Sequence, residues 1–418
     1  MCNGTVYRGD LSLNQFASSS RQFKLLRPED RLLVHCARTS LDRERKTLIG
    51  DLARGPIDWD YLAEIAWANR VMPLLYRSLQ LSCPQDVPGI TLRNLQFQFL
   101  ANAGRTHLLN QRLLSILREL DSHKIPVVPI KGPVLAAFAY GNISLRQFED
   151  LEILVHKRHA IMAGSCVQAL GYSDSFGLMP KFDTLQLRYQ QHFSLISHSS
   201  DTLVDLHWTL EPGKTLTHFS DVTVWERMKT TSLDGVPVRN LSSEDLLLYL
   251  CVHGSNHCWH RLSWICDVAQ LVGTCPNMNW EAVIEQAQLL QRQRMLFLGL
   301  ALATDLLEAS IPDEILKICR CYPGVEELAR LTQKRIFSGT KDFLGFRSTF
   351  SFHLMARESV SDKLLFCLER FVFPDPLDLQ VLNLPTFLFF LYFAVRPMRL
   401  IAKYCWDNSL RKHREVDT

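Results

Sequence analysis

The chain has 418 residues, with 46 Lys and Arg against 43 Asp and Glu, a formal net charge of +3 at pH 7 and a hydrophobic fraction of 47%. At about 150 residues per domain this length indicates two or three domains, and the composition excludes a disordered or fibrous chain. The nearly balanced charge argues against a general nucleic-acid binder, because such proteins carry a strongly basic surface.

The first predicted region, residues 1–120, is helical. Apolar residues recur three and four positions apart over Trp59–Gln80 and Leu92–Leu120, the spacing that places them on one face of a helix. Asp58 stands directly before the first of these segments and is a typical helix N-cap residue.

The second predicted region, residues 121–240, mixes strands and helices. Runs rich in apolar and β-branched residues predict strands over Ile125–Ile130, Leu151–Val155, His192–Ile196 and Leu203–Leu210. The last two of these strands flank the polar stretch Ser197–Asp201, whose residues favour a turn, so these two strands are expected to form a hairpin.

The third predicted region, residues 241–418, is helical again. It starts at Ser242, whose hydroxyl can cap a helix that has acidic residues in its first turn. Together the three regions predict an α+β fold, in which a small mixed β-sheet is flanked by N- and C-terminal helical regions.

The most apolar run near the C-terminus is Phe387–Val395. It is much shorter than the about 20 residues that a membrane-spanning helix needs, so we expect a helix packed on the protein and no transmembrane segment. Arg396, Arg399 and Lys403 follow at helical spacing beside apolar residues, a pattern that also suits peripheral contact with a membrane surface.

Twelve cysteines are spread along the whole chain. No apolar segment of the secretory type follows Met1, and the close pair Cys319 and Cys321 has neither a Cys-x-x-Cys nor a zinc-site spacing. We therefore expect reduced thiols and a cytoplasmic location.

The segment from Pro129 to Leu135 has the pattern of a strand that runs into a helix. Pro133 suits the first helical turn, where its missing N–H is not needed. Gly132 allows the backbone to approach a ligand, the free N–H groups of the helix start can bind an anion, and Lys131 adds a positive charge. This is a candidate triphosphate site, although the same residues also occur in ordinary turns.

Acidic residues alternate with apolar residues in two of the predicted strands. Asp150 and Glu152 share one face of the first, and Asp205 and His207 share one face of the second. If these strands are neighbours, the three carboxylates converge, and their mutual repulsion favours divalent cations with oxygen ligands. For the acidic pair alone, a solvated edge strand is the alternative.

These motifs occur together with further characteristic positions, and in combination they resemble the bacterial nucleotidyltransferase family of the DNA polymerase β-like superfamily. The resemblance covers nearly the full chain. The further positions are Tyr140-Gly141, Arg146, Val204-Asp205-Leu206-His207-Trp208, the helical stretch with His253, His257, Trp259, Arg261, Trp264 and Asp267, and the regions around Asp58-Trp59 and Arg396-Pro397.

The resemblance implies transfer of a nucleoside monophosphate from an NTP to a hydroxyl acceptor, with release of pyrophosphate. Carried over by position, Asp150 and Glu152 would bridge Mg²⁺ (or Mn²⁺) ions. Asp205 would hold the catalytic ion and help to deprotonate the attacking hydroxyl. Lys131 and Gly132 would face the triphosphate.

Arg146 would neutralise charge that develops on a phosphate in the transition state. Two positions depart from the superfamily pattern. The turn is Gly132-Pro133 where Gly-Ser or Gly-Gly is usual, which removes an N–H and a hydroxyl from the phosphate turn. The acidic pair ends in Glu152 where Asp is commoner, but a longer carboxylate still reaches a metal.

A histidine cluster follows on the next predicted helix. His253 and His257 lie one helical turn apart, and with Asp267 they could bind zinc. The alternative is a packed polar network that lines an acceptor pocket together with His207, in which Asp267 orients a histidine or pairs with Arg261.

The leading hypothesis is therefore a Mg²⁺-dependent nucleotidyltransferase that uses an NTP and modifies a hydroxyl on a small molecule, sugar or protein. A nucleic-acid partner is not expected, because no basic stripe with interleaved aromatic residues occurs. The first alternative is a catalytically inactive scaffold or sensor that binds nucleotide. A weaker alternative is a histidine–metal hydrolase.

Overall fold

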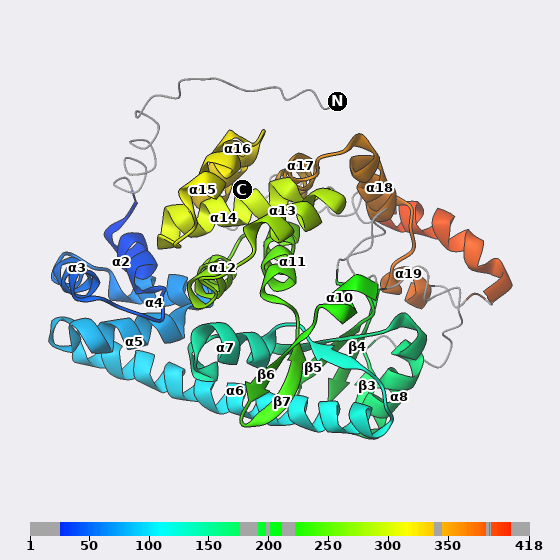
Figure 1. Cartoon of the computed structure of the whole chain (residues 1–418), viewed down its shortest axis with the longest axis horizontal. Helices are drawn as coiled ribbons and strands as arrows, with labels where there is room; N and C mark the ends of the chain where they lie inside the picture. The colour runs from blue at the N-terminus through cyan, green and yellow to red at the C-terminus, as the bar shows by residue number, and fades with distance from the viewer. Residues whose placement is uncertain are drawn as a thin grey trace, which may run out of the picture.

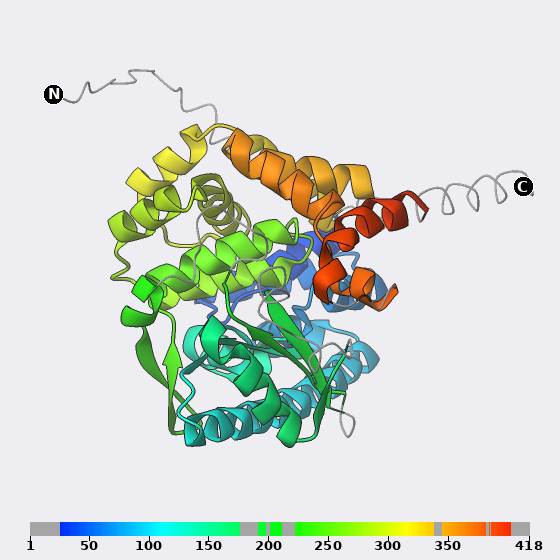
Figure 2. The ribbon, with the colours of Figure 1, turned by 90° about the vertical axis from the view of Figure 1, so that its right-hand side faces the viewer.

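The computed structural model describes residues 26–175, 191–197, 201–210, 222–337, 345–381, 384 and 386–402. A small β-sheet lies against the long helix α6 (Gly89–Ser122), and most of the C-terminal helices lie on the other side of the sheet (Figures 1 and 2). This arrangement confirms the expected fold class of a mixed sheet flanked by helical regions.

Helices fill the N-terminal region, as the sequence predicts. Asp58 accepts a hydrogen bond of 3.0 Å from the Tyr61 N–H and starts α4. The predicted segment Trp59–Gln80 is two helices, because the chain turns at Arg70 (φ +56°) and Pro73 lacks the N–H that would continue the first one. The bounds are α2 (Pro28–Cys36), α3 (Arg43–Ala53), α4 (Trp59–Ala68), α5 (Met72–Ser82) and the 3-10 turn η1 (Pro84–Asp86).

The main sheet has the strand order β1-β2-β5-β4-β3, in which β2 and β5 are parallel and the other neighbours antiparallel. The predicted strands are confirmed, the first and last of them shorter than expected, and β3 is an addition. Residues 198–200 of the predicted turn lie outside the described residues. The bounds are β1 (Val127–Pro129), β2 (Asp150–Val155), β3 (Tyr172–Asp174), β4 (His192–Ser197) and β5 (Leu203–His207).

Alternation along β2 and β5 gives the sheet one apolar and one polar face. Leu151, Ile153 and Leu206 are at most 1% exposed and pack in one cluster with residues of α6 and α8 (Ala160–Ala169). Glu152 and Asp205 point to the opposite face. This polar side of the sheet, here called the acidic face because it carries Asp150, Glu152 and Asp205, is directed away from α6 and toward the C-terminal helices.

Shorter elements connect the sheet to the helices. A second, two-stranded sheet is turned by Asp234 and Gly235, both with positive φ as in a two-residue hairpin loop. These elements are α7 (Gly132–Tyr140), η2 (Ile143–Leu145), η3 (Lys157–His159), α10 (Val222–Glu226), β6 (Lys229–Leu233) and β7 (Val236–Asn240).

The region after residue 241 is helical, as predicted. The Ser242 hydroxyl accepts a hydrogen bond of 3.1 Å from the Asp245 N–H and starts α11. The bounds are α11 (Ser243–Asn256), α12 (Leu262–Thr274), α13 (Trp280–Leu289), α14 (Gln293–Leu307), α15 (Asp313–Cys321), α16 (Val325–Phe337), α17 (Phe346–Ala356), α18 (Val360–Phe371), α19 (Pro376–Val381) and the 3-10 turn η6 (Thr386–Leu391).

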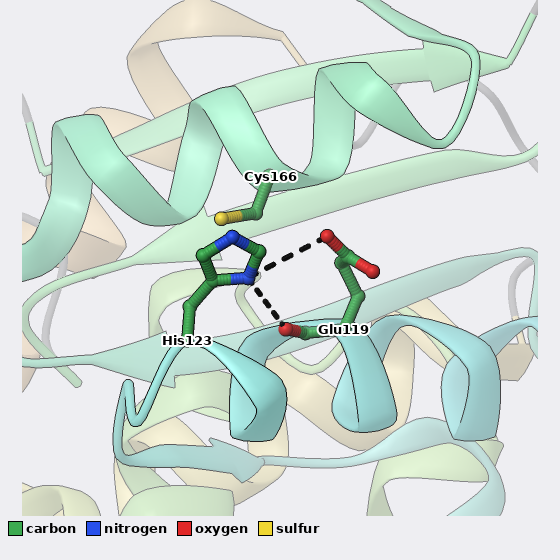
Figure 3. A group of neighbouring side chains, drawn as sticks. All are labelled: Glu119, His123 and Cys166. Carbon is green, nitrogen blue, oxygen red and sulfur yellow. Dashed lines mark hydrogen bonds and ion pairs between the residues drawn. The ribbon is translucent and has the colours of Figure 1, made fainter.

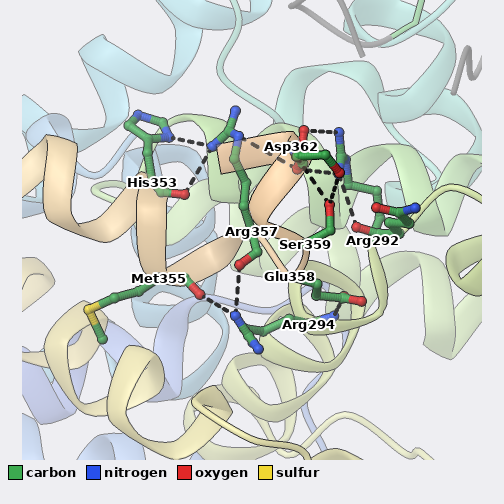
Figure 4. Close-up of polar contacts among 10 residues, drawn as sticks. Arg292, Arg294, His353, Met355, Arg357, Glu358, Ser359 and Asp362 are labelled. Carbon is green, nitrogen blue, oxygen red and sulfur yellow. Dashed lines mark hydrogen bonds and ion pairs between the residues drawn. The ribbon is translucent and has the colours of Figure 1, made fainter. Parts of the chain in front are cut away.

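Buried polar contacts attach α17 and α18 to the start of α14 (Figure 4). Arg292 is 2% exposed and pairs with Asp362 at 2.8 Å. Arg294 donates to the carbonyl oxygens of Met355 (2.7 Å) and Arg357 (2.9 Å). The two arginines therefore hold α14 against α17 and α18.

A single apolar core includes side chains from both helical regions, among them Leu75 of α5, Leu248 of α11 and Leu300 of α14. The two regions therefore pack together above the sheet. The domain limits predicted at residues 120 and 240 stay a prediction.

The C-terminal segment forms a small separate cluster in which Phe389 and Tyr392 are buried against Leu379. The predicted helix Phe387–Val395 begins as the 3-10 turn η6 and becomes α-helical over 392–402. Arg396 and Arg399 pair with Asp375 and Asp378 of the preceding segment, while Lys403 lies outside the described residues. In the described parts of the chain, no helix is long and apolar enough to cross a membrane.

Candidate active site

Three carboxylates share the polar face of the main sheet. Asp150 and Glu152 lie two residues apart on β2, and the parallel pairing of β2 with β5 places Glu152 opposite Asp205. Strands in a sheet are spaced by about 4.8 Å. The structure thus brings together the three acidic residues that the sequence singles out.

Lys131 and Tyr249 hold the carboxylate of Glu152. The Lys131 ammonium lies 2.7 Å from Oε1, and the Tyr249 hydroxyl donates to Oε2 at 3.0 Å. Burial alone would raise the pKa of Glu152, but the Lys131 charge, the nearby His253 and His207 and the Lys131 hydrogen bond together outweigh burial, so the pKa lies well below its usual range. Glu152 is therefore ionised and already has two partners.

Asp205 lies in a different environment. The Ser194 hydroxyl donates to its Oδ1 at 2.6 Å. Burial raises the pKa of the Asp205 carboxyl; the Ser194 hydrogen bond opposes this shift, while the charges of Glu152 and Asp150 add to it. A carboxylate that is buried near like charges favours a cation beside it.

The oxygen-only donor set of Asp150, Glu152 and Asp205 fits Mg²⁺ or Mn²⁺, which prefer carboxylate ligands. Their oxygens do not all lie within 4.8 Å of one another among the described residues. Both oxygens of Glu152 already have partners, Lys131 and Tyr249.

The Lys131-Gly132 turn connects β1 to α7. Gly132 has φ +57°, the left-handed region that favours glycine, and Pro133 stands in the first turn of α7. This agrees with the predicted turn. However, the Lys131 ammonium is directed at Glu152 and also donates to His253 Nε2 at 3.0 Å.

Arg146 has a different partner from the one expected. Its guanidinium binds Asp267 with both arms, at 2.7 and 2.9 Å, and the Tyr140 hydroxyl donates to the same carboxylate at 2.7 Å. Arg146 is 8% exposed and Asp267 is fully buried. This network favours a structural role for Arg146, and it corrects the expectation that Asp267 binds a histidine or Arg261.

The histidines line the wall opposite the carboxylates. The rings of His253 and His257 lie 4.5 Å apart, and His257 stacks on Trp264 at 4.9 Å. Burial and the Lys131 charge lower the pKa of His253 well below its usual value and that of His257 to about 4. Both imidazoles are therefore neutral at pH 7, which is the form that binds a metal. The zinc interpretation is not favoured because Asp267, its third ligand, pairs with Arg146 and Tyr140.

His207 points to the polar face from β5 and stacks on His192 of β4, with ring centroids 5.0 Å apart. Burial lowers the pKa of His207 to about 3. Three further residues of the site were not predicted from the sequence: His192 and the two hydroxyl donors, Tyr249 and Ser194. Tyr249 precedes His253 by one helical turn, so the helical spacing could have indicated it.

The main sheet carries three carboxylates on one face, next to the Lys131-Gly132 turn and to helix α11, which carries the histidines. The chain belongs to a family of uncharacterised nucleotidyltransferases, whose family model matches residues 55–308. Every residue of the site lies within this range. Family membership supports a role in nucleotidyl transfer.

Other comparisons add little. Among solved structures, an antigenic nucleotidyltransferase-like protein from Paracoccidioides brasiliensis is 16% identical, and the match covers 50% of this chain and 93% of that protein. Its TM-score of 0.26 is too low to support an argument. No curated protein matches the chain.

Proposed function

We propose that the chain is a Mg²⁺-dependent nucleotidyltransferase of the polymerase β-like superfamily, like the bacterial proteins that its motifs resemble. It transfers a nucleoside monophosphate from an NTP to a hydroxyl acceptor and releases pyrophosphate. The observation that carries this proposal is the group of three carboxylates, Asp150, Glu152 and Asp205, on the neighbouring parallel strands β2 and β5. Their mutual repulsion favours a bound cation.

In this proposal the three carboxylates hold Mg²⁺ or Mn²⁺. When bound, the metal would stabilise charge on the attacking and leaving oxygens. A metal on Glu152 would compete with the Lys131 ammonium for this carboxylate, and Lys131 and Gly132 would face the triphosphate. Because Lys131 is 7% exposed, its charge acts with little screening by water.

Asp205 accepts the proton of the attacking hydroxyl. The Ser194 hydroxyl donates to its Oδ1 and would hold the carboxylate in position. The neutral rings of His207, His253 and His257 line the acceptor pocket without adding charge. We propose a small molecule, sugar or protein hydroxyl as acceptor and a cytoplasmic location.

The experiment is to incubate the purified chain with Mg²⁺, each α-labelled NTP and a cell extract, and to follow pyrophosphate release and the labelled product. Asp150→Asn and Asp205→Asn should fold and lose turnover, because a neutral amide neither balances a divalent cation nor accepts the proton. Asp201→Asn is the matched control, since Asp201 precedes β5 and is exposed. Wild-type turnover in either site variant would refute the role of that residue.

One observation favours the inactive scaffold as a second candidate. Lys131 and Tyr249 already satisfy Glu152, so this carboxylate is stable without a metal. A scaffold would bind NTP, measured by calorimetry, and would release no pyrophosphate with any NTP or extract. An enzyme would do both.

A further inference from the structure

A second group of possible metal ligands lies on the opposite side of the main sheet from the three carboxylates. Glu119 is in the last turn of α6, His123 follows the end of that helix, and Cys166 faces them from α8 (Figure 3). One ligand atom from each lies within 4.8 Å of the other two. Neither the nucleotidyl-transfer proposal nor the motifs use these residues.

The geometry suits a tetrahedral metal ion. Zn²⁺ binds sulfur at about 2.3 Å and nitrogen or oxygen at about 2.0–2.2 Å, which places tetrahedral ligand atoms about 3.3–3.8 Å apart. The three ligand atoms lie within 4.8 Å of one another, so each pair would have to approach by at most about 1.5 Å to bind one ion. The side chains of Glu119 and His123 are 30% and 44% exposed, so the ion can enter from solvent.

The imidazole of His123 is oriented for binding. Its Nδ1 lies 3.0 Å from the carbonyl oxygen of Glu119, and donation to this carbonyl leaves the lone pair on Nε2. Figure 3 shows Nε2 directed toward the sulfur of Cys166. Histidines that bind metals commonly have their second nitrogen held in this way.

The chemistry of the donors selects the metal. A thiolate, an imidazole and a carboxylate favour Zn²⁺ over Mg²⁺, because sulfur is a soft ligand. Burial and the charge of Glu119 raise the pKa of the Cys166 thiol, so the thiol stays protonated until a metal displaces its proton to solvent.

We propose that Glu119, His123 and Cys166 bind one Zn²⁺ ion, with water as the fourth ligand. The ion joins the end of α6 to α8 behind the sheet. It supports the strands that carry the acidic face and takes no part in the chemistry there.

The test uses Co²⁺ as a spectroscopic substitute on the full chain. In excess Mg²⁺, which would occupy the three carboxylates of the other site, the wild type should bind one Co²⁺ with a thiolate-to-metal charge-transfer absorption. Cys166→Ser should abolish the band and weaken Co²⁺ binding by more than the about tenfold that loss of an outer-shell partner costs. Cys321→Ser, at an exposed thiol, and Asp150→Asn, at the other site, should keep both properties.

A second measurement needs no variant. One equivalent of Zn²⁺ should slow alkylation of Cys166 in the wild type, followed by mass spectrometry of its peptide, and leave alkylation of Cys321 unchanged. A charge-transfer band that persists in Cys166→Ser, or equal alkylation of Cys166 with and without Zn²⁺, would overturn the proposal. Loss of the band in Asp150→Asn would do the same, because the two sites would then be one.

Discussion

Replacing Lys131 by Met tests the electrostatics of the acidic face. Methionine keeps most of the length of the lysine stem and removes the ammonium, which lies 2.7 Å from Glu152. The side chains of Lys131 and Glu152 are 8% and 12% exposed. The substitution therefore leaves a nearly buried carboxylate with Tyr249 as its remaining described hydrogen-bond donor.

The expected loss is large. Removing one partner of a buried ion pair costs about 3–5 kcal/mol, because the other charge stays desolvated. For a chain of this size, about 1–2 °C of Tm accompanies each kcal/mol, so Lys131→Met should melt about 3–10 °C below the wild type at pH 7. In the double variant Lys131→Met/Glu152→Gln, no unpaired charge remains and most of the loss should be recovered.

The control is Arg54→Met. Arg54 pairs with Asp51 and Asp86, but its own side chain is 56% exposed, and pairs of an exposed arginine contribute below about 1 kcal/mol each. Thermal unfolding of the four proteins, followed by circular dichroism without divalent metal, gives the comparison. A loss in Lys131→Met that is no larger than the loss in Arg54→Met would refute the reasoning.

The pH dependence gives a second check. Lys131 holds the pKa of Glu152 well below its usual range, so the contribution of the pair is full above the unfolded pKa of about 4.3 and declines as the pH falls below it. Without the ammonium, burial raises the pH at which Glu152 takes up a proton. Protonation removes the buried unpaired charge and with it the loss of stability. The difference in Tm between wild type and Lys131→Met should narrow from pH 7 to about pH 4.5, and a constant difference would contradict the assignment.

Three further substitutions have defined outcomes, all measured by thermal unfolding. Asp205→Asn should raise Tm at pH 7 without metal, because the folded pKa of the carboxyl is raised; this gain should vanish below about pH 4, where the carboxyl is protonated in both states. Gly132→Ala should cost about 1–2 kcal/mol, because φ is +57° there, whereas Gly104→Ala, in open space on α6, should not destabilise. Arg146→Met should cost about 3–5 kcal/mol by leaving Asp267 unpaired, and a loss near zero would contradict the buried network.

The sequence predicts those parts of the fold in which local chemistry decides the structure. Strand alternation identifies the buried faces of β2 and β5, because a shift of one residue would bury Asp150 or Asp205 and expose their neighbours. The helix starts at Asp58 and Ser242 can be predicted from the sequence, because each capping hydrogen bond joins residues only three positions apart. In the hairpin of β6 and β7, Asp234-Gly235 is a typical turn pair, but the flanking strands lack a clear apolar alternation that would predict them.

The partners within the site are less predictable, because they join distant parts of the chain. Arg146 and Asp267 are 121 residues apart, and Lys131 and His253 are 122 apart. No local sequence pattern predicts that α12 places Asp267 beside Arg146 and not beside a histidine. Residue type and spacing predict the carboxylates of the site. Which carboxylate pairs with Lys131 and which with Arg146 depends on how the helices pack over the sheet, and we call this pairing the allocation of the cations.

That allocation bears directly on the proposed function. The acidic face holds three carboxylates, and one buried ammonium, Lys131, already neutralises Glu152. A divalent cation on Asp150, Glu152 and Asp205 would make the face less negative and would release Lys131 toward an anion. Metal and triphosphate would then each favour binding of the other, by equal factors in the two directions. If Lys131 stays on Glu152 when NTP binds, this exchange does not occur, and the same residues serve a scaffold instead of an enzyme.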